Sequence, residues 1–149
     1  MRSTRSVLAA SALAALSVGA TTALAAPASA AADITPQSVC GSSYKTVNSA
    51  AVGSLGTIYL TYNSSNGKNC ITTIRNTPGT AVDMSAWIYV PDTDEYDDDY
   101  GQYSSYAGPR YVYGKAHCVD WGGNIDNVHV QVYNSNCGAL KEHRVTFTR

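Results

Sequence analysis

The sequence predicts an all-β fold, specifically a small antiparallel β-sandwich or barrel stapled by two disulfides. Eleven tyrosines and frequent valine, isoleucine and threonine favour strands over helices. Short segments that alternate apolar and polar residues recur at close spacing, separated by turn-forming residues. The chain also has four cysteines, an even number.

The N-terminal segment, residues 1–30, is predicted to be a Sec-type signal peptide. Arg2 and Arg5 form its positive region, an apolar run follows over residues 7–24, and Ala28-x-Ala30 supplies the small side chains that signal peptidase requires. A membrane anchor is the alternative, but the run is short and interrupted by Ser, Gly and Thr. Without adjacent arginines or a cysteine at the cleavage point, we expect neither twin-arginine export nor a lipoprotein.

The remaining residues, 31–149, are expected to form a single secreted β domain with no membrane contact after cleavage. Eight lysines and arginines stand there against eleven acidic residues. The domain therefore lacks the basic surface on which nucleic-acid binding depends. Six of the acids fall in Asp92–Asp99, so the charge is strongly uneven.

The four cysteines, Cys40, Cys70, Cys118 and Cys137, all lie in the mature part. In an exported chain this predicts two disulfides. Three pairings are possible in principle, and we prefer the sequential one, Cys40 with Cys70 and Cys118 with Cys137, because it needs only local closures. A four-thiolate zinc site is the alternative, which the absence of Cys-x-x-Cys spacing disfavours.

The first half of the domain predicts a hairpin. After an irregular lead-in, residues 33–43, three strands are expected at Tyr44–Val52, Thr57–Tyr62 and Cys70–Arg75. The second and third pair through a turn at Asn66-Gly67. Period-two alternation places Ile58 and Leu60 on one face.

The second half predicts shorter strands with several breaks. In Val82–Val90, Met84, Ala86, Ile88 and Val90 share one face, with Trp87 and Tyr89 on the other. We expect the following, in order: a short strand at Tyr103–Tyr106, a break at Gly108-Pro109, a strand at Arg110–Cys118, a turn at Trp121–Asn124, a strand at Asn127–Tyr133, and a last strand or frayed tail around Val145–Phe147.

The acidic run has two interpretations. Asp92, Asp94, Asp97, Asp98 and Asp99 offer the hard oxygen ligands that calcium prefers. The run does not match the EF-hand spacing, and adjacent side chains of an extended chain point apart. We therefore favour a mobile, exposed hairpin tip that binds calcium weakly or not at all.

The sequence contains no recognisable catalytic constellation. There is no Gly-x-Ser-x-Gly elbow, and the three histidines, His117, His129 and His143, show no metal-ligand spacing. His117 precedes Asp120 by three residues, but a half-exposed sheet histidine is the simpler interpretation. We expect no enzyme activity, no metal and no cofactor.

Clustered aromatic residues suggest a binding surface. Such rings beside carboxylates stack on sugars or anchor a protein interface. The alternative is that these tyrosines simply populate ordinary strand faces. The candidate aromatic face consists of Trp87, Tyr89, Tyr103, Tyr106, Tyr111 and Tyr113.

Several motifs occur together in one order: Gly56-Thr-Ile-Tyr-Leu-Thr-Tyr-Asn-Ser-Ser-Asn-Gly-Lys-Asn-Cys70, Tyr106-Ala-Gly-Pro-Arg-Tyr-Val112 and Cys118-Val-Asp-Trp-Gly-Gly123. With them, the chain resembles the spore-associated protein A family of filamentous actinomycetes. The resemblance covers most of residues 38–138, whereas the acidic run and the tail after Gly138 depart from the pattern. It implies a small exported protein found with spores or in culture fluid, and it brings no catalytic residues.

These observations lead to one main hypothesis and two alternatives. The main one is a non-enzymatic secreted protein that is extracellular or associated with the spore or cell surface. The alternatives are an extracellular module that binds carbohydrate or cell wall through the aromatic face, and a small secreted hydrolase inhibitor. The expected partner is a cell-wall or spore-surface polymer, with no nucleic acid.

Overall fold

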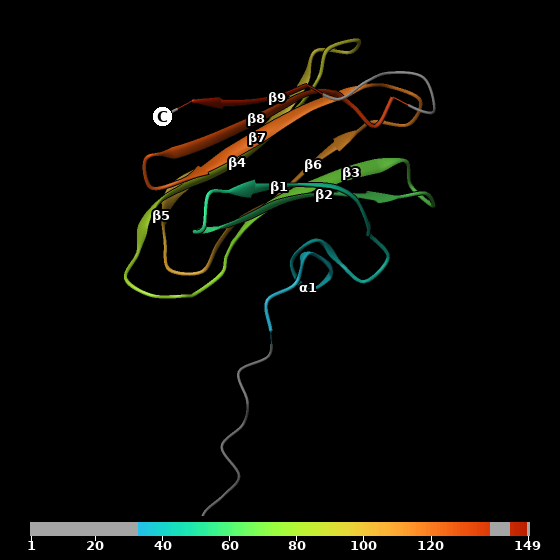
Figure 1. Ribbon diagram of the computed structural model, residues 1–149. Helices are drawn as coiled ribbons and strands as arrows, with labels where there is room; N and C mark the ends of the chain where they lie inside the picture. The colour runs from blue at the N-terminus through green and yellow to red at the C-terminus, as the bar shows by residue number, and fades with distance from the viewer. Residues whose placement is uncertain (1–32, 138–143, 149) are drawn as a thin grey trace, which may run out of the picture. The chain divides into compact units, whose positions relative to one another are not determined.

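The computed structural model describes residues 33–137 and 144–148, in the last of which only the backbone is described. The described strands form two antiparallel sheets that pack face to face (Figure 1). This confirms the predicted all-β class and selects the sandwich. The predicted signal peptide, residues 1–30, lies outside the described residues.

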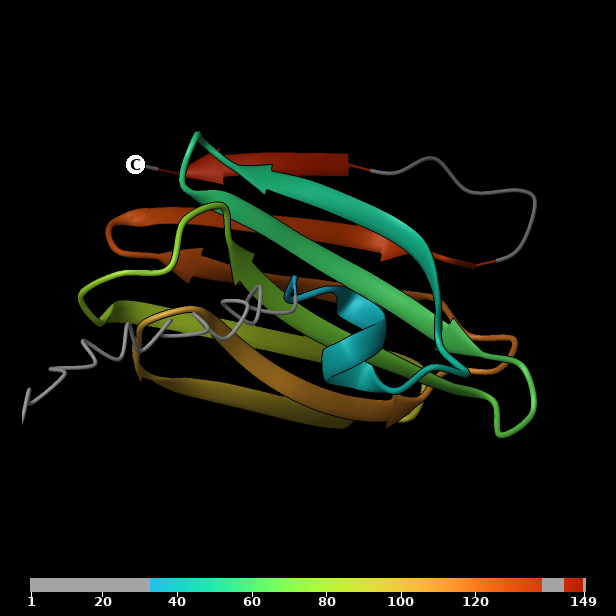
Figure 2. The ribbon, with the colours of Figure 1, turned by 90° about the horizontal axis from the view of Figure 1, so that it is seen from below.

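One sheet has four strands in the order β1-β2-β3-β6, and the other has five in the order β5-β4-β7-β8-β9. The elements are α1 (Pro36–Cys40), β1 (Lys45–Val52), β2 (Gly56–Asn63), β3 (Lys68–Arg75), β4 (Val82–Val90), β5 (Glu95–Tyr103), β6 (Tyr106–Tyr113), β7 (Val119–Ile125), β8 (Val128–Ser135) and β9 (Arg144–Thr148). In Figure 2, β5 and β6 lie at one edge of the sandwich, and β1 and β9 lie at the other.

The core lies between the sheets and follows the alternation in the sequence. In the four-stranded sheet, β2 directs Ile58 and Leu60 inward, and both are fully buried. In the five-stranded sheet, Met84, Ala86, Ile88 and Val90 of β4 are also fully buried. The predicted hairpin is confirmed, because β2 pairs with β3 in continuous register from Gly56 opposite Arg75 to Asn63 opposite Lys68.

The lead-in contains a short helix that the sequence analysis did not expect. Thr35 and Ser38 cap α1 reciprocally through their side chains and backbone N–H groups, and Pro36 occupies its first turn. The helix lies on the outer face of the four-stranded sheet in both views (Figures 1 and 2). The cap explains why five residues remain helical here.

The two disulfides have the preferred sequential pairing. Cys40–Cys70 joins α1 to β3, and Cys118–Cys137 joins the start of β7 to the segment after β8. Beside the first bond, Tyr44 and Tyr111 pack with their ring centroids 5.5 Å apart. Tyr111 also donates a hydrogen bond to the carbonyl oxygen of Cys40 at 3.0 Å. This small cluster fixes the helix to the sheet.

Four local predictions are wrong. Glu95–Tyr103 is a strand, not part of an exposed tip, and Gly108-Pro109 lies within β6 instead of ending a strand. Trp121–Asn124 belongs to β7, which is hydrogen-bonded to β4 on one side and to β8 on the other, instead of forming a turn. The expected strand Arg110–Cys118 ends early, because β6 stops at Tyr113.

The glycine pair in β7 fits because its neighbours leave no room for side chains. A Cβ on Gly123 would collide with the carbonyl oxygen of Ser85, and it would lie 2.7 Å from Oγ1 of Thr73 on the opposite sheet. That Oγ1 donates a hydrogen bond to the same carbonyl oxygen at 2.7 Å, which links the two sheets. Gly122-Gly123 therefore serves close packing and not chain reversal.

Candidate functional site

Three acidic side chains of β5 close one edge of the sandwich. Glu95, Asp97 and Asp99 alternate along the strand and point towards β6. Their carboxylates accept hydrogen bonds from the backbone N–H groups of Tyr113 at 3.0 Å, Tyr111 at 2.9 Å and Gly108 at 2.7 Å, respectively. The carboxylates thus satisfy donors on the edge of β6 that no strand pairs.

Asp99 is the most heavily bonded of the three. Its carboxylate also accepts hydrogen bonds from the Tyr103 hydroxyl at 2.7 Å and from the Arg110 guanidinium at 3.0 Å. Burial tends to raise the pKa of Asp99, but the hydrogen bonds from Gly108, Tyr103 and Arg110 outweigh it, so the pKa is lowered. The hydrogen bond to Asp99 in turn raises the pKa of Tyr103.

The prediction that the acidic run is a hairpin tip is therefore wrong for its second part. Asp92–Asp94 do form an exposed turn, but the chain re-enters the sheet at Glu95, and Asp97 and Asp99 are partly buried there. The sequence analysis treated the acids as one run, whereas alternation assigns them to two faces with different partners. Within residues 33–137 and 144–148 no group of three metal-binding side chains is found. Weak or absent calcium binding remains a prediction.

The six candidate aromatic residues do not form one face. Trp87 and Tyr89 lie on the outer surface of the five-stranded sheet, and Tyr111 and Tyr113 lie on the outer surface of the four-stranded sheet. Tyr103 and Tyr106 flank the turn between β5 and β6. Sequence proximity grouped rings that the two sheets separate.

The structure adds two exposed tyrosines to the first of these surfaces. Tyr96 and Tyr100 are 57% and 67% exposed, on the same side of β5 as Asp98. In register, Tyr96 lies opposite Tyr89 and Asp98 opposite Trp87. We call this set, Trp87 and Tyr89 of β4 with Tyr96, Asp98 and Tyr100 of β5, the Trp87 face. Period-two reading of Glu95–Tyr103 as a strand would have identified its β5 members.

Gly122 allows the Trp87 indole to pack directly against the sheet. Gly122 of β7 is its neighbour in register, and a Cβ there would lie 2.7 Å from Cζ2 and 2.8 Å from Cε2 of the indole. The six-membered part of the ring therefore covers the position where a side chain would stand. Trp87 is half-buried, so the ring surface turned away from Gly122 remains accessible.

Two phenols of the Trp87 face, Tyr89 and Tyr96, have raised pKa values. Tyr89 donates a hydrogen bond to Asp94 at 2.9 Å, which raises its pKa, and its ring meets that of Tyr96 edge-on with centroids 6.4 Å apart. Partial burial, followed by the charges of Asp98 and Asp97, raises the pKa of Tyr96. Asp98 itself has no hydrogen-bond partner among the described side chains and backbone groups.

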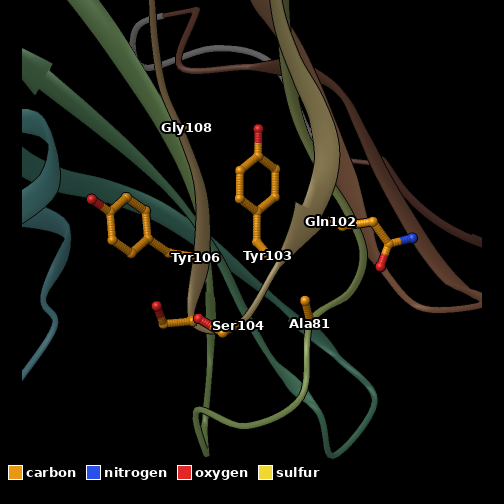
Figure 3. A pocket seen from close by; sticks show the side chains of 7 residues that line it. Ala81, Gln102, Tyr103, Ser104, Tyr106 and Gly108 are labelled. Carbon is orange, nitrogen blue, oxygen red and sulfur yellow. The ribbon is translucent and has the colours of Figure 1, made fainter.

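A surface cavity of about 410 Å³ lies beside the turn between β5 and β6. Figure 3 shows Tyr103 standing between the strands, with Ser104 below it, Tyr106 on one side and Gln102 on the other. The lining, completed by Ala81, Ser105 and Gly108, mixes polar and apolar groups and carries no charged side chain. The cavity is open to solvent, so it offers no enclosed or charged binding site.

Among the described residues, the histidines form no metal-binding group. His117 is half-exposed, with its Nδ1 3.1 Å from an Asp92 carboxylate oxygen, and His129 is exposed on β8. These positions agree with the interpretation of ordinary sheet and loop histidines, while His143 lies outside the described residues. In the described ranges, no helix has the length and apolar character of a membrane span.

Comparison with known proteins finds a relative in Streptomyces coelicolor, "Spore-associated protein A". The two are 56% identical over 104 residues, which is 68% of this chain and 66% of the relative. The chain belongs to the spore-associated protein A family. It spans slightly less than two thirds of that relative's length. No protein-family model matches the chain, and no solved structure matches it.

Membership of the spore-associated protein A family agrees with the resemblance of the ordered motifs. Two of those motifs lie in β2–β3 and in β6, which pair with each other through β3, and the third opens β7. The motifs therefore lie in strands that build the sandwich. They contain none of the five residues of the Trp87 face.

Proposed function

We propose that this family member is a non-enzymatic secreted protein that associates with the spore or cell surface. The observation that carries the proposal is its similarity to a relative named as spore-associated. The two disulfides support it, because such bonds persist in oxidising compartments outside the cytosol. The predicted Sec-type signal at residues 1–30 supplies the route.

Cell fractionation tests the location. Immunodetection in spores, vegetative cells, cytosol and culture fluid of the producing organism should find the protein on spores or cell surfaces and in the fluid. The N-terminus of that protein should lie near Ala31. Recovery from the cytosol with Met1 intact would overturn the export part of the proposal.

Activity screening tests the non-enzymatic part. The purified mature protein should turn over none of a panel of ester, peptide, glycoside and phosphate substrates above a buffer blank. Turnover that persists through repurification and is abolished by unfolding the protein would contradict the proposal.

Binding to carbohydrate or cell wall is the second candidate, and it is a mode of attachment rather than a competing role. A specific observation favours it: an accessible indole and two exposed phenols share one sheet surface. Aromatic rings in this arrangement supply apolar contact area while their hydroxyls remain in water.

A further inference from the structure

The Trp87 face has the layout of a track and not of a pocket. Tyr96, Asp98 and Tyr100 occupy alternate positions of one strand, so their side chains leave the sheet in the same direction. The outer two are separated by four residues, or roughly 13 Å of extended chain. Trp87 lies beside the midpoint, opposite Asp98. An extended ligand could therefore contact several rings at once.

The charges of the surrounding strands restrict the ligand. Strands β4, β5, β7 and β8 contain no lysine or arginine, whereas Asp98 and Asp120 lie on the outer surface of this sheet. Asp120 is engaged, because it accepts a hydrogen bond from the Asn134 N–H at 2.7 Å. Asp98 is left as a free acceptor. A polyanion would meet repulsion from Asp98 at the Trp87 face, where β4 and β5 offer it no lysine or arginine.

An uncharged sugar chain matches both features. The C–H face of a pyranose ring packs on an aromatic ring, as Trp87 and Tyr100 offer, and a neighbouring hydroxyl can donate to the carboxylate of Asp98. The other acids of β5 are unavailable, since Glu95, Asp97 and Asp99 are bonded to β6. Because the indole lies against Gly122, it offers a flat surface to the C–H face of a pyranose ring.

We infer that the Trp87 face binds a polysaccharide strand composed of uncharged sugar rings. This inference rests on the proposed surface association and identifies the ligand class through which it occurs. Trp87, Tyr96 and Tyr100 stack on the sugar rings, and Asp98 accepts a hydrogen bond from a sugar hydroxyl.

Co-sedimentation of the intact mature protein with insoluble cellulose, chitin and starch tests the inference, with alginate beads as the anionic comparison. We expect binding to at least one uncharged polymer and none to alginate. Tyr100→Ala and Tyr96→Ala should each weaken binding roughly tenfold, and Asp98→Asn about threefold. Tyr113→Ala is the matched control, because that ring is 44% exposed on the other sheet.

Trp87→Ala should abolish measurable binding, but the ring also covers Gly122, so its thermal melt must match the wild type before the result counts. If the Trp87→Ala variant does not fold, the Tyr100→Ala variant decides the test, because Tyr100 is well exposed. Binding to none of the uncharged polymers, an equal loss in Tyr113→Ala, or self-association through the Trp87 face in place of sugar binding would overturn the inference.

A parallel assay on intact spores distinguishes a failure of the sugar-binding inference from a failure of the proposed surface association. If spores retain both the wild type and a Tyr96→Ala/Tyr100→Ala variant equally, the ligand assignment is wrong while surface association stands. If spores and cell surfaces retain neither protein although the uncharged polymer binds the wild type, surface association fails and the sugar site remains.

Discussion

Asp99 shows how a single carboxylate in an acidic run becomes structural. Its two oxygens accept hydrogen bonds from a backbone amide, a phenol and a guanidinium on three different residues. Tyr103 belongs to β5, and Gly108 and Arg110 belong to β6. Removing the carboxylate therefore leaves several hydrogen-bond donors unsatisfied at once. Its neighbour Asp98 points the other way and has none of these partners.

Asp99→Ala should therefore lower the free energy of unfolding by about 1–3 kcal/mol, because the Gly108 N–H and the Arg110 guanidinium lose their acceptor. Urea unfolding followed by circular dichroism measures this. Asp98→Ala is the control and should change stability by less than about 0.5 kcal/mol. Equal effects of the two variants would contradict the assigned role of Asp99.

The lowered pKa of Asp99 also predicts acid sensitivity. A carboxyl whose pKa is lower in the folded than in the unfolded state stabilises the protein fully above its unfolded pKa, about 3.9. That stabilisation is lost as the pH falls through the folded pKa. The melting temperature of the wild type should fall as the pH is lowered from 7 to 2. Over the same range, the difference in melting temperature between the wild type and Asp99→Asn should become smaller. A difference that stays constant over this range would show that Asp99 is not responsible.

At the scale of elements, β7 shows why a glycine pair need not reverse the chain. Hydrogen bonding to β4 and β8 holds it inside the five-stranded sheet. Gly122 makes room for the Trp87 indole on the outer surface, and Gly123 makes room for the Thr73–Ser85 hydrogen bond between the sheets. Two consecutive glycines thus serve opposite faces of one strand.

Gly123→Ala should destabilise the fold by about 1–3 kcal/mol, because the added methyl group meets backbone that cannot easily move. Thermal melting of the purified variant measures the effect. Gly79→Ala is the matched control: its Cβ would come no closer than 3.7 Å to a flexible arginine side chain, so little change is expected. A Gly123→Ala protein as stable as wild type would refute the close packing.

At the scale of the whole molecule, a sandwich closed at one edge by side chains is combined with two covalent staples. The edge between β5 and β6 depends on three carboxylates, while the disulfides fix α1 to β3 and the start of β7 to the segment after β8. The residues of the Trp87 face take part in neither the carboxylate contacts nor the disulfides.

Removal of the first staple by a Cys40→Ser/Cys70→Ser variant should lower the free energy of unfolding by about 3–4 kcal/mol, because the bond closes a loop with a sequence separation of 30 residues. Urea unfolding tests this. Non-reducing peptide mapping of the wild type should recover linked peptides for Cys40–Cys70 and Cys118–Cys137. A peptide linking Cys40 to Cys118 would contradict the connectivity.

The local sequence pattern predicted many of the strands, the disulfides and the family of this protein. Period-two alternation identified β2 and β4 with their buried faces, and it identified the strand β8, because inward apolar residues satisfy the strand geometry and the core together. The turn at Asn66-Gly67 indicated β3 as the partner of β2. The cysteine count and spacing indicated the disulfides, and the ordered motifs indicated the family. The aromatic richness of residues 87–113 suggested a binding surface, which stays a prediction, and two of the six proposed residues, Trp87 and Tyr89, lie on the Trp87 face.

The tertiary structure alone decided the rest, since each of those features depends on partners distant in sequence. Glu95, Asp97 and Asp99 lie in a strand because β5 pairs with β4, and β6 presents backbone amides to their carboxylates. Gly122-Gly123 stays extended because β4 and β8 pair with it. Tyr96 and Tyr100 join Trp87 through strand pairing, while Tyr111 and Tyr113 belong to the other sheet. Local alternation determines which side a residue faces, and only strand pairing determines its neighbours.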